Sequence, residues 1–219
     1  MRYYPIHLDL KNRPVLVVGG GVIAEGKALQ LVEAGAAVRL VSPTLTAQLS
    51  EMVNQSMIEY RCGNFIESDL AGVVLVISAT NDQSVNEEVA QAAAARGLLH
   101  NVVDQPALCS FITPALVTRG DLQISISTGG GSPSVAQRVK REIGELIGEE
   151  YGELLALAAA LRAEVRKRPA TFEQRRELLR TFAESEAVDL IRAGRRAEAQ
   201  RIADELLAAS ESPVHITSH

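Results

Sequence analysis

A cluster of glycines directly after a short apolar run is the feature that most limits how this chain can fold. Pro14 to Val18 (PVLVV) lacks polar alternation, which is typical of a strand buried on both faces of a parallel sheet. The hexapeptide GGGVIA at 19–24 follows and fits the pattern GxGxxA where a helix begins. This pattern predicts a strand–turn–helix unit that binds a dinucleotide; a plain tight turn is the alternative.

Each position of this motif has a physical role in holding a pyrophosphate. Gly19 permits the tight turn, and Gly21 lets the backbone approach the phosphates without a Cβ in the way. Ala24 keeps the helix close to the sheet. The free N–H groups at the helix N-terminus, around Val22 and Ile23, supply positive potential. These five residues are therefore predicted to bind the cofactor.

The acidic residue that usually binds the ribose is missing. It should stand near the end of the second strand, roughly 20 residues after the glycines. The sequence has Ser42, Pro43 and Thr44 at this place, so backbone groups and hydroxyls around Pro43 and Thr44 are expected to hold the ribose. Arg39, inside the strand, is the nearest arginine, which favours NAD over NADP only mildly and leaves a 2′-phosphate possible.

Strands and helices alternate in the first half of the chain. Strands are predicted at 14–18, 38–41, 73–78 and 98–103, and helices at 25–34 and 85–95. Helices of this length between strands imply right-handed crossovers and a parallel sheet.

The pattern changes after residue 110. Strands at 111–118 and 122–128 are predicted to pair as a hairpin, and from Ser134 the chain is predicted to be helical with a break at Pro169. The expected fold is α/β. A Rossmann-type dinucleotide-binding domain (1–113) precedes a β-hairpin and helix region (114–147) and a small all-helical C-terminal domain (148–219).

Composition excludes several classes of function. The formal net charge is −5 and aromatic residues make up 4% of the chain, so we expect no nucleic-acid partner and no anionic membrane partner. Cys62 and Cys109 lie far apart without ligand spacing, so neither a disulfide framework nor structural zinc is expected, and both are predicted to be buried or partly buried thiols. The N-terminus lacks the apolar core of a signal peptide, and no apolar run has the length of a membrane span, which together predict a cytoplasmic protein.

Polar residues follow two further predicted strands. Asp104 lies just past the strand at 98–103, on the edge where open α/β sheets bind ligands. A carboxylate there can accept a proton, although an aspartate that only caps the turn before Pro106 is the alternative. Thr80 and Asn81, after the strand at 73–78, are predicted to contact the cofactor, and Asp82 is predicted to cap the next helix.

With these motifs in place, the sequence resembles the precorrin-2 dehydrogenase/sirohydrochlorin ferrochelatase family, which includes the N-terminal half of bifunctional sirohaem synthase. The matching stretches are VVGGGVIAEGKA (17–28), AVRLVSP (37–43), ISATNDQSVNEEV (77–89), NVVDQPALCSFITPA (101–115) and ISTGGGSPSVAQRVKREI (126–143). Gly26 departs from the family, whose members usually have arginine there.

The resemblance implies an activity and an assembly. NAD would oxidise the tetrapyrrole precorrin-2 to sirohydrochlorin, and many family members also insert Fe²⁺ to give sirohaem. Asp104 matches the family's catalytic aspartate, and no resident metal site is expected beyond transient Fe²⁺. The family layout adds an intertwined homodimer with dimerisation assigned to 114–147. Because the chain ends at His219, the methyltransferase half is expected to be absent. A dehydrogenase without chelatase activity and a non-catalytic dinucleotide-sensing module remain alternatives.

A second glycine-rich loop joins the predicted hairpin to the helix after it. Ser132 as N-cap with Pro133 at the first helical position is a good helix start. Its free N–H groups would hold a substrate carboxylate, and a tight strand-to-helix connection is the alternative. Substrate-binding candidates are therefore Thr128, Gly129, Gly130, Ser132 and Arg138, with Lys140 and Arg141 as further cations. Serine is common at position 128 in bacterial relatives and its modification is linked to regulation, a role that Thr128 puts in doubt.

Overall fold

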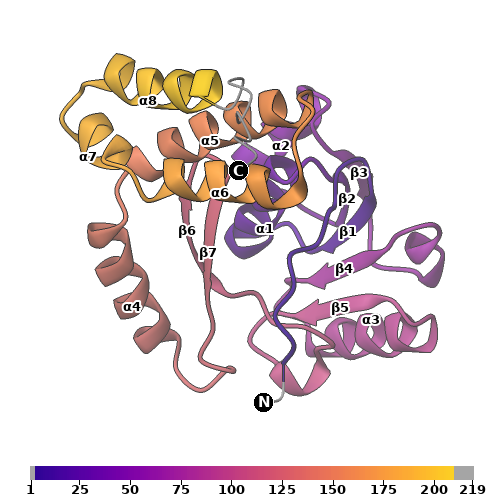
Figure 1. Ribbon diagram of the computed structural model, residues 1–219. Coiled ribbons are helices and arrows are strands. Elements are labelled where there is room, and N and C mark those ends of the chain that lie inside the picture. Colours follow the sequence, from indigo (N-terminus) through magenta and orange to yellow (C-terminus); the bar gives the residue numbers. More distant parts are fainter. Residues whose placement is uncertain (1–2, 210–219) are drawn as a thin grey trace, which may run out of the picture. The chain divides into compact units, whose positions relative to one another are not determined.

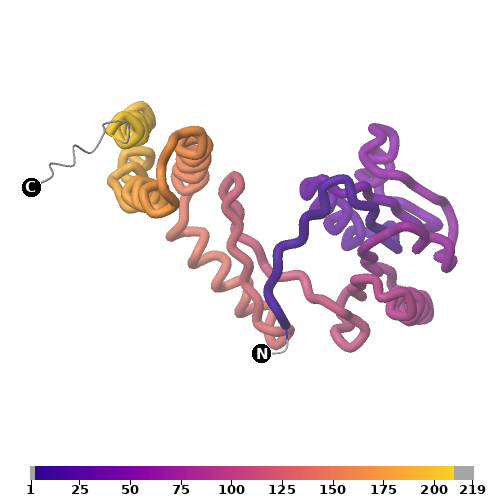
Figure 2. Tube along the Cα trace, turned by 45° about the vertical axis from the view of Figure 1, so that its right-hand side comes forward, coloured from indigo at the N-terminus to yellow at the C-terminus, as the bar shows by residue number. Residues whose placement is uncertain are grey.

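The computed structural model describes residues 3–209. The chain divides into two compact units, Met1–Thr113 and Pro114–His219. The two can be followed by colour in Figure 2, the first from indigo to magenta and the second from pink to yellow. None of the helices in the described part of the chain is long and apolar enough to cross a membrane.

The first unit is built on a five-stranded sheet (Figure 1). Its strands are β1 (Pro14–Val18), β2 (Ala37–Ser42), β3 (Glu59–Cys62), β4 (Leu75–Ser78) and β5 (Leu99–Val102). The strand order is β3-β2-β1-β4-β5 and every neighbouring pair is parallel, with Val15 opposite both Val38 and Leu75. The predicted parallel sheet is therefore confirmed, and all five strands end at one edge.

Helices cover both faces of this sheet because β1 is apolar on both sides. Val15 and Val17 face a core with α1 (Val22–Glu33) and α2 (Ala47–Asn54), to which Ala28 and Leu49 contribute. Leu16 and Val18 face an opposite core with α3 (Gln83–Ala95). The exposed fraction of the β1 side chains from Val15 to Val18 does not exceed 3%, which agrees with the uninterrupted apolar run.

Several predicted bounds differ from the structure. The first strand of the predicted hairpin begins at Ala115 rather than at residue 111, the strand predicted at 73–78 begins at Leu75, and α3 begins at Gln83 rather than at residue 85. Helix α1 begins at Val22 rather than at residue 25, so it starts directly behind the glycines. Helix α2, strand β3 and two short 3₁₀ segments, Glu67–Leu70 and Pro106–Leu108, have no counterpart in the sequence analysis. Strand β3 lies at the sheet edge and none of its residues is buried, so it lacks the apolar run that marks the central strands.

The second unit combines a hairpin with five helices in its described part. Strands β6 (Ala115–Arg119) and β7 (Leu122–Ile126) pair antiparallel, with Val117 opposite Ile124. The following helices are α4 (Pro133–Leu146), α5 (Glu150–Arg166), α6 (Phe172–Ala183), α7 (Ala187–Arg192) and α8 (Arg196–Ala209). Helices α5 to α8 share a core around Leu161 and Phe182.

Arg119 fastens the hairpin to the end of α4. Its guanidinium donates to the carbonyl oxygens of Gly144, at 2.8 Å, and Ile147, at 2.9 Å. Because the last carbonyls of a helix have no partner within the helix, these bonds satisfy groups that would otherwise face solvent. Gly152, on α5, packs so closely on Arg119 that a Cβ would lie 2.8 Å from the Arg119 carbonyl carbon. Hairpin, α4 and α5 therefore meet at one arginine.

Candidate active site

The first two glycines of the loop after β1 allow three strand ends to pack together. Gly19 has a φ of +122°, and a Cβ there would lie 2.3 Å from the carbonyl oxygen of Ala79, after β4. A Cβ on Gly20 would lie 1.9 Å from the carbonyl oxygen of Thr44, after β2. The loops after β1, β2 and β4 are therefore in backbone contact, and neither position has room for a side chain.

Gly21 differs because the space in front of it is open. No atom lies within 4 Å of the position that a Cβ would take. Gly21 is the N-cap of α1 and supplies no side-chain cap, and Val22 and Ile23 are exposed by 75% and 51%. The first N–H groups of α1 therefore point into open space with the positive end of the helix dipole behind them. This cradle fits the pyrophosphate of a dinucleotide, as the glycine motif predicts.

The loop after β2 is tied to the glycine loop rather than to an acid at the strand end. Pro43 and Thr44 are exposed, as a ribose-binding edge requires. Thr46, the N-cap of α2, donates its N–H to the carbonyl of Gly20 at 3.0 Å. Its hydroxyl donates to Oε2 of Glu25 at 2.5 Å. The sequence analysis missed Glu25, a carboxylate on the first turn of α1 that directly follows GxGxxA.

The loop after β4 is held by a buried polar pair. The Ser78 hydroxyl donates to Oδ1 of Asn86 at 2.7 Å, and Nδ2 of Asn86 donates to the Thr80 carbonyl at 3.1 Å. Both Ser78 and Asn86 are buried, so this pair fixes the turn that carries Thr80 and Asn81. Asp82 caps α3, as predicted. The Ser84 hydroxyl and the N–H groups of Val85 and Ser84 hold the pKa of Asp82 below its ordinary value.

Asp104 lies on the turn directly after β5. It is exposed and has a φ of +59°, the left-handed region that few residues other than glycine, asparagine and aspartate adopt. The Cys109 thiol closes this turn, because Sγ lies 3.2 Å from the carbonyl oxygens of Val102 and Gln105. Burial raises the pKa of the Cys109 thiol. Asp104 therefore lies on a turn that the Cys109 thiol holds, at the same sheet edge as the glycine loop.

Lys27 reaches this edge from α1, which the sequence analysis did not foresee. Its Nζ donates to the Thr113 hydroxyl at 3.2 Å. Burial lowers the pKa of Lys27, and the negative charge of Asp104 acts in the opposite direction. The signal in the sequence was a lysine between the small residues Ala24 and Ala28, on the helix that follows the glycines.

The second glycine-rich loop belongs to the second unit. The Ser132 hydroxyl accepts from the Val135 N–H at 3.3 Å and caps α4, as predicted. The Thr128 hydroxyl accepts from the Ser132 N–H at 3.2 Å and donates to its carbonyl, while Gly129 and Gly130 have positive φ. Arg138 pairs with Glu142 at 2.8 Å, which raises the pKa of Arg138. The role of Arg138 in substrate binding stays a prediction.

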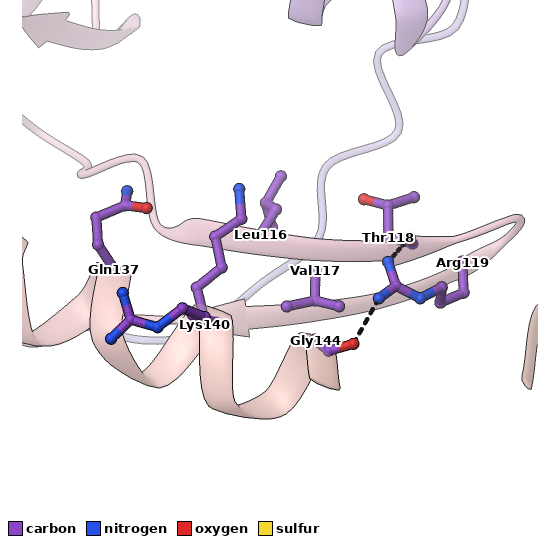
Figure 3. Close-up of a pocket in the computed structure, with 8 residues that line it drawn as sticks. Leu116, Val117, Thr118, Arg119, Gln137, Lys140 and Gly144 are labelled. Atoms are coloured by element: carbon purple, nitrogen blue, oxygen red, sulfur yellow. Dashed lines mark hydrogen bonds between the residues drawn. The ribbon is translucent and has the colours of Figure 1, made fainter. Parts of the chain in front are cut away.

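An open groove of about 590 Å³ lies between the hairpin and α4 (Figure 3). Gln137 and Lys140 line the groove from α4, while the Arg119 guanidinium donates to the Gly144 carbonyl (Figure 3). Arg141 also lines the groove, whereas Arg138 does not. Two of the three predicted cations of α4 thus lie on one side of that helix.

The two cysteines and a histidine on β5 have simple structural roles. Cys62 is exposed, so the prediction of a buried or partly buried thiol is wrong for it; it ends the edge strand β3. Both cysteines are free thiols. His100 lies on β5 with its Nδ1 3.0 Å from the Leu98 carbonyl. Between residues 3 and 209 no three or more His, Cys, Asp and Glu side chains group as a metal site.

Comparison with protein families gives three consecutive matches. Residues 6–115 match the family described as putative NAD(P)-binding, 119–146 the sirohaem biosynthesis protein central family, and 150–207 the sirohaem synthase dimerisation region. The last segment lies after 114–147, to which the sequence analysis assigned dimerisation.

Curated relatives and a solved structure agree with these matches. Sirohaem synthase of Stutzerimonas stutzeri (strain A1501) is 43% identical over 95% of this chain, and that of Pseudomonas aeruginosa (strain LESB58) is 39% identical over 95%. The chain spans 45% of the length of each of these two relatives. Among solved structures, SirC, a precorrin-2 dehydrogenase, aligns with a TM-score of 0.79 at 28% identity, over 93% of this chain and 100% of SirC.

Proposed function

This chain belongs to the precorrin-2 dehydrogenase/sirohydrochlorin ferrochelatase family, which includes the N-terminal half of bifunctional sirohaem synthase, and we propose that it oxidises precorrin-2 to sirohydrochlorin. Its cofactor is NAD, which accepts a hydride when bound. The chain is thus assigned to NAD-dependent oxidation in sirohaem synthesis.

One observation carries the proposal: the open cradle at Gly21 and the exposed carboxylate of Asp104 follow β1 and β5 of one parallel sheet. Since all strands run the same way, both groups lie at the edge where open α/β sheets bind ligands. Loops after β2 and β4 supply Pro43, Thr44 and Thr80 along the same edge. We propose that they and Asn81 hold the cofactor between the two ends.

Asp104 is proposed as the base of the oxidation. Its exposed carboxylate accepts a proton from the tetrapyrrole as the hydride leaves for NAD, so the substrate loses two electrons and two protons in all. A left-handed φ at a non-glycine residue costs about 1 kcal/mol or more, and such strain is common at functional sites. The Asp104 side chain is exposed, so its carboxylate is accessible to a substrate.

We further propose ferrous iron insertion at the same carboxylate. Fe²⁺ enters as a substrate and replaces two pyrrole protons, which need an acceptor. An oxygen ligand suits Fe²⁺ in transit. The two activities are separable in an anaerobic assay: iron uptake into sirohydrochlorin at the uncatalysed rate, with normal NADH formation from precorrin-2, would leave only the dehydrogenase.

The proposed assembly is a homodimer, supported by the match of residues 150–207 to the sirohaem synthase dimerisation region. Sedimentation of the wild type tests the dimer. A separate proposal is that the second glycine-rich loop binds substrate, and substrate titration of Ser132→Ala tests it; the residues concerned are Thr128, Gly129, Gly130 and Ser132.

The decisive variant for the reaction is Asp104→Asn. Asparagine tolerates the left-handed conformation, so it removes the charge without the strain that alanine would add. We expect wild-type affinity for NAD and a loss of most NADH formation from precorrin-2. A variant that turns over normally would exclude Asp104 as the base. A wild type that binds NAD but forms no NADH from precorrin-2 would instead favour a dinucleotide-sensing module.

A further inference from the structure

We infer that Lys27 is an anchor for one carboxylate of the tetrapyrrole, placed near the proposed base but not paired with it. The inference rests on the proposed function, because it names a contact to that substrate in the same site. It starts from Lys27, Thr113 and Asp104, which belong to the same compact unit.

The surroundings of Lys27 are unusual for a lysine. Its side chain is half-buried between α1 and the segment after β5, and the hydrogen bond found for its ammonium goes to the neutral hydroxyl of Thr113. Three arginines of this unit pair with acids: Arg39 with Glu59, Arg61 with Asp69 and Arg96 with Glu67. A partly desolvated ammonium without a counter-ion is unfavourable, and the lowered pKa of Lys27 has the same cause.

Asp104 is close enough to act on Lys27 by its charge but forms no ion pair with it in the described structure. A direct pair would neutralise both groups. The separation instead leaves one cation and one anion exposed to the same ligand. An ammonium has three donors, and Thr113 accepts one, so two remain for an incoming oxygen.

The position of Lys27 separates it from the parts of the edge assigned to the ribose and the pyrophosphate of the cofactor. Thr113 and Asp104 belong to the chain after β5, whereas the ribose loop follows β2, on the other side of β1 and β4. Lys27 also lies beyond the first turn of α1, whose N–H groups face the pyrophosphate. An anion that reaches Lys27 is therefore assigned to the substrate. Precorrin-2 carries carboxylates around its ring, so one can reach Lys27 while the macrocycle faces Asp104.

The test compares three variants with the wild type. Lys27→Met removes the charge and keeps the length of the stem, and Thr113→Val removes the hydrogen-bond acceptor and keeps the shape. Lys11→Met is the matched control, since Lys11 is an exposed lysine of the same unit before β1, at the amino edge of the sheet. Sirohydrochlorin and NAD are titrated separately into each protein by absorbance and fluorescence, and thermal unfolding is recorded without ligand.

Lys27→Met is expected to bind sirohydrochlorin about 10- to 100-fold more weakly, the size of one lost charge-assisted hydrogen bond. Its NAD affinity is expected to stay that of the wild type, and its unfolding temperature is expected not to fall, because the variant loses a partly desolvated charge. Thr113→Val is expected to lose a fewfold in sirohydrochlorin affinity, and Lys11→Met none.

If the wild type oxidises precorrin-2 and Lys27→Met binds sirohydrochlorin with unchanged affinity, the inference is overturned and the proposed function stands. A loss of NAD affinity of the same size would also overturn it, because the lysine would then serve a cofactor phosphate. A wild type that neither binds sirohydrochlorin nor oxidises precorrin-2 would overturn both.

Discussion

Replacing Gly21 by alanine separates ligand binding from folding. A Cβ at Gly21 meets no atom within 4 Å, and the φ of −87° suits alanine. Alanine is a poorer N-cap than glycine, but it restricts the unfolded chain by about 0.4–1 kcal/mol. The two effects oppose each other, so we expect the free energy of unfolding of Gly21→Ala to change by less than about 1 kcal/mol.

Binding of NAD should respond strongly to the same methyl group. It projects into the space in front of α1, where the pyrophosphate must approach the first N–H groups. Loss of one hydrogen bond to a charged group costs about 1.5–3 kcal/mol, which corresponds to a roughly 10- to 150-fold larger dissociation constant for NAD. Gly21→Asp adds charge repulsion and should abolish binding.

Gly20→Ala is the control with the opposite profile. Its Cβ would lie 1.9 Å from the Thr44 carbonyl oxygen and 2.7 Å from the Ser42 hydroxyl, so the loop after β2 must move. We expect a destabilisation of at least about 2 kcal/mol. Urea unfolding and calorimetric titration with NAD measure both quantities. Wild-type NAD affinity in Gly21→Ala would refute the cradle, and wild-type stability in Gly20→Ala would refute the packing of the two loops.

Three further predictions follow from the same unit. Asn86→Ala should destabilise the protein by about 1–3 kcal/mol, because it leaves the buried Ser78 hydroxyl without its partner; an unchanged urea midpoint would contradict this. Since burial raises the pKa of Cys109, iodoacetamide should alkylate it more slowly at pH 8 than the exposed Cys62, and equal rates by mass spectrometry would contradict this. Hydrogen bonds hold the pKa of Asp82 below its ordinary value. The difference in free energy of unfolding between the wild type and Asp82→Ala should therefore be largest above about pH 4 and should vanish as the pH falls through the lowered pKa. A difference independent of pH would argue against the cap.

The central strands and the glycine loop were predictable because their physics is local. Strand β1 is apolar at every position, and a strand buried on both faces needs that pattern. Strand β3 has the sequence EYRC at the sheet edge, where no apolar run is required, so periodicity could not reveal it. Its partner helix α2 was missed with it.

The residues of the candidate site also differ in whether local sequence could point to them. Asp104 was singled out because it follows a predicted strand and matches the family's catalytic aspartate, and its position at the ligand edge follows from strand direction. Its role stays a prediction. Lys27 and Glu25 were not found because their importance depends on contacts with Thr113 and Thr46, which lie far away in the sequence. Sequence spacing within α1 carries no information about what packs against it.

The hydrogen bonds of Arg119 to the end of α4 have a mechanical consequence for the second unit. A single guanidinium grips the last carbonyls of α4, at Gly144 and Ile147, while the backbone behind it is wedged against Gly152. The short connection between α4 and α5 is thus clamped and cannot act as a free hinge. A protease that nicks it should leave two fragments that stay together under native conditions and part only in denaturant.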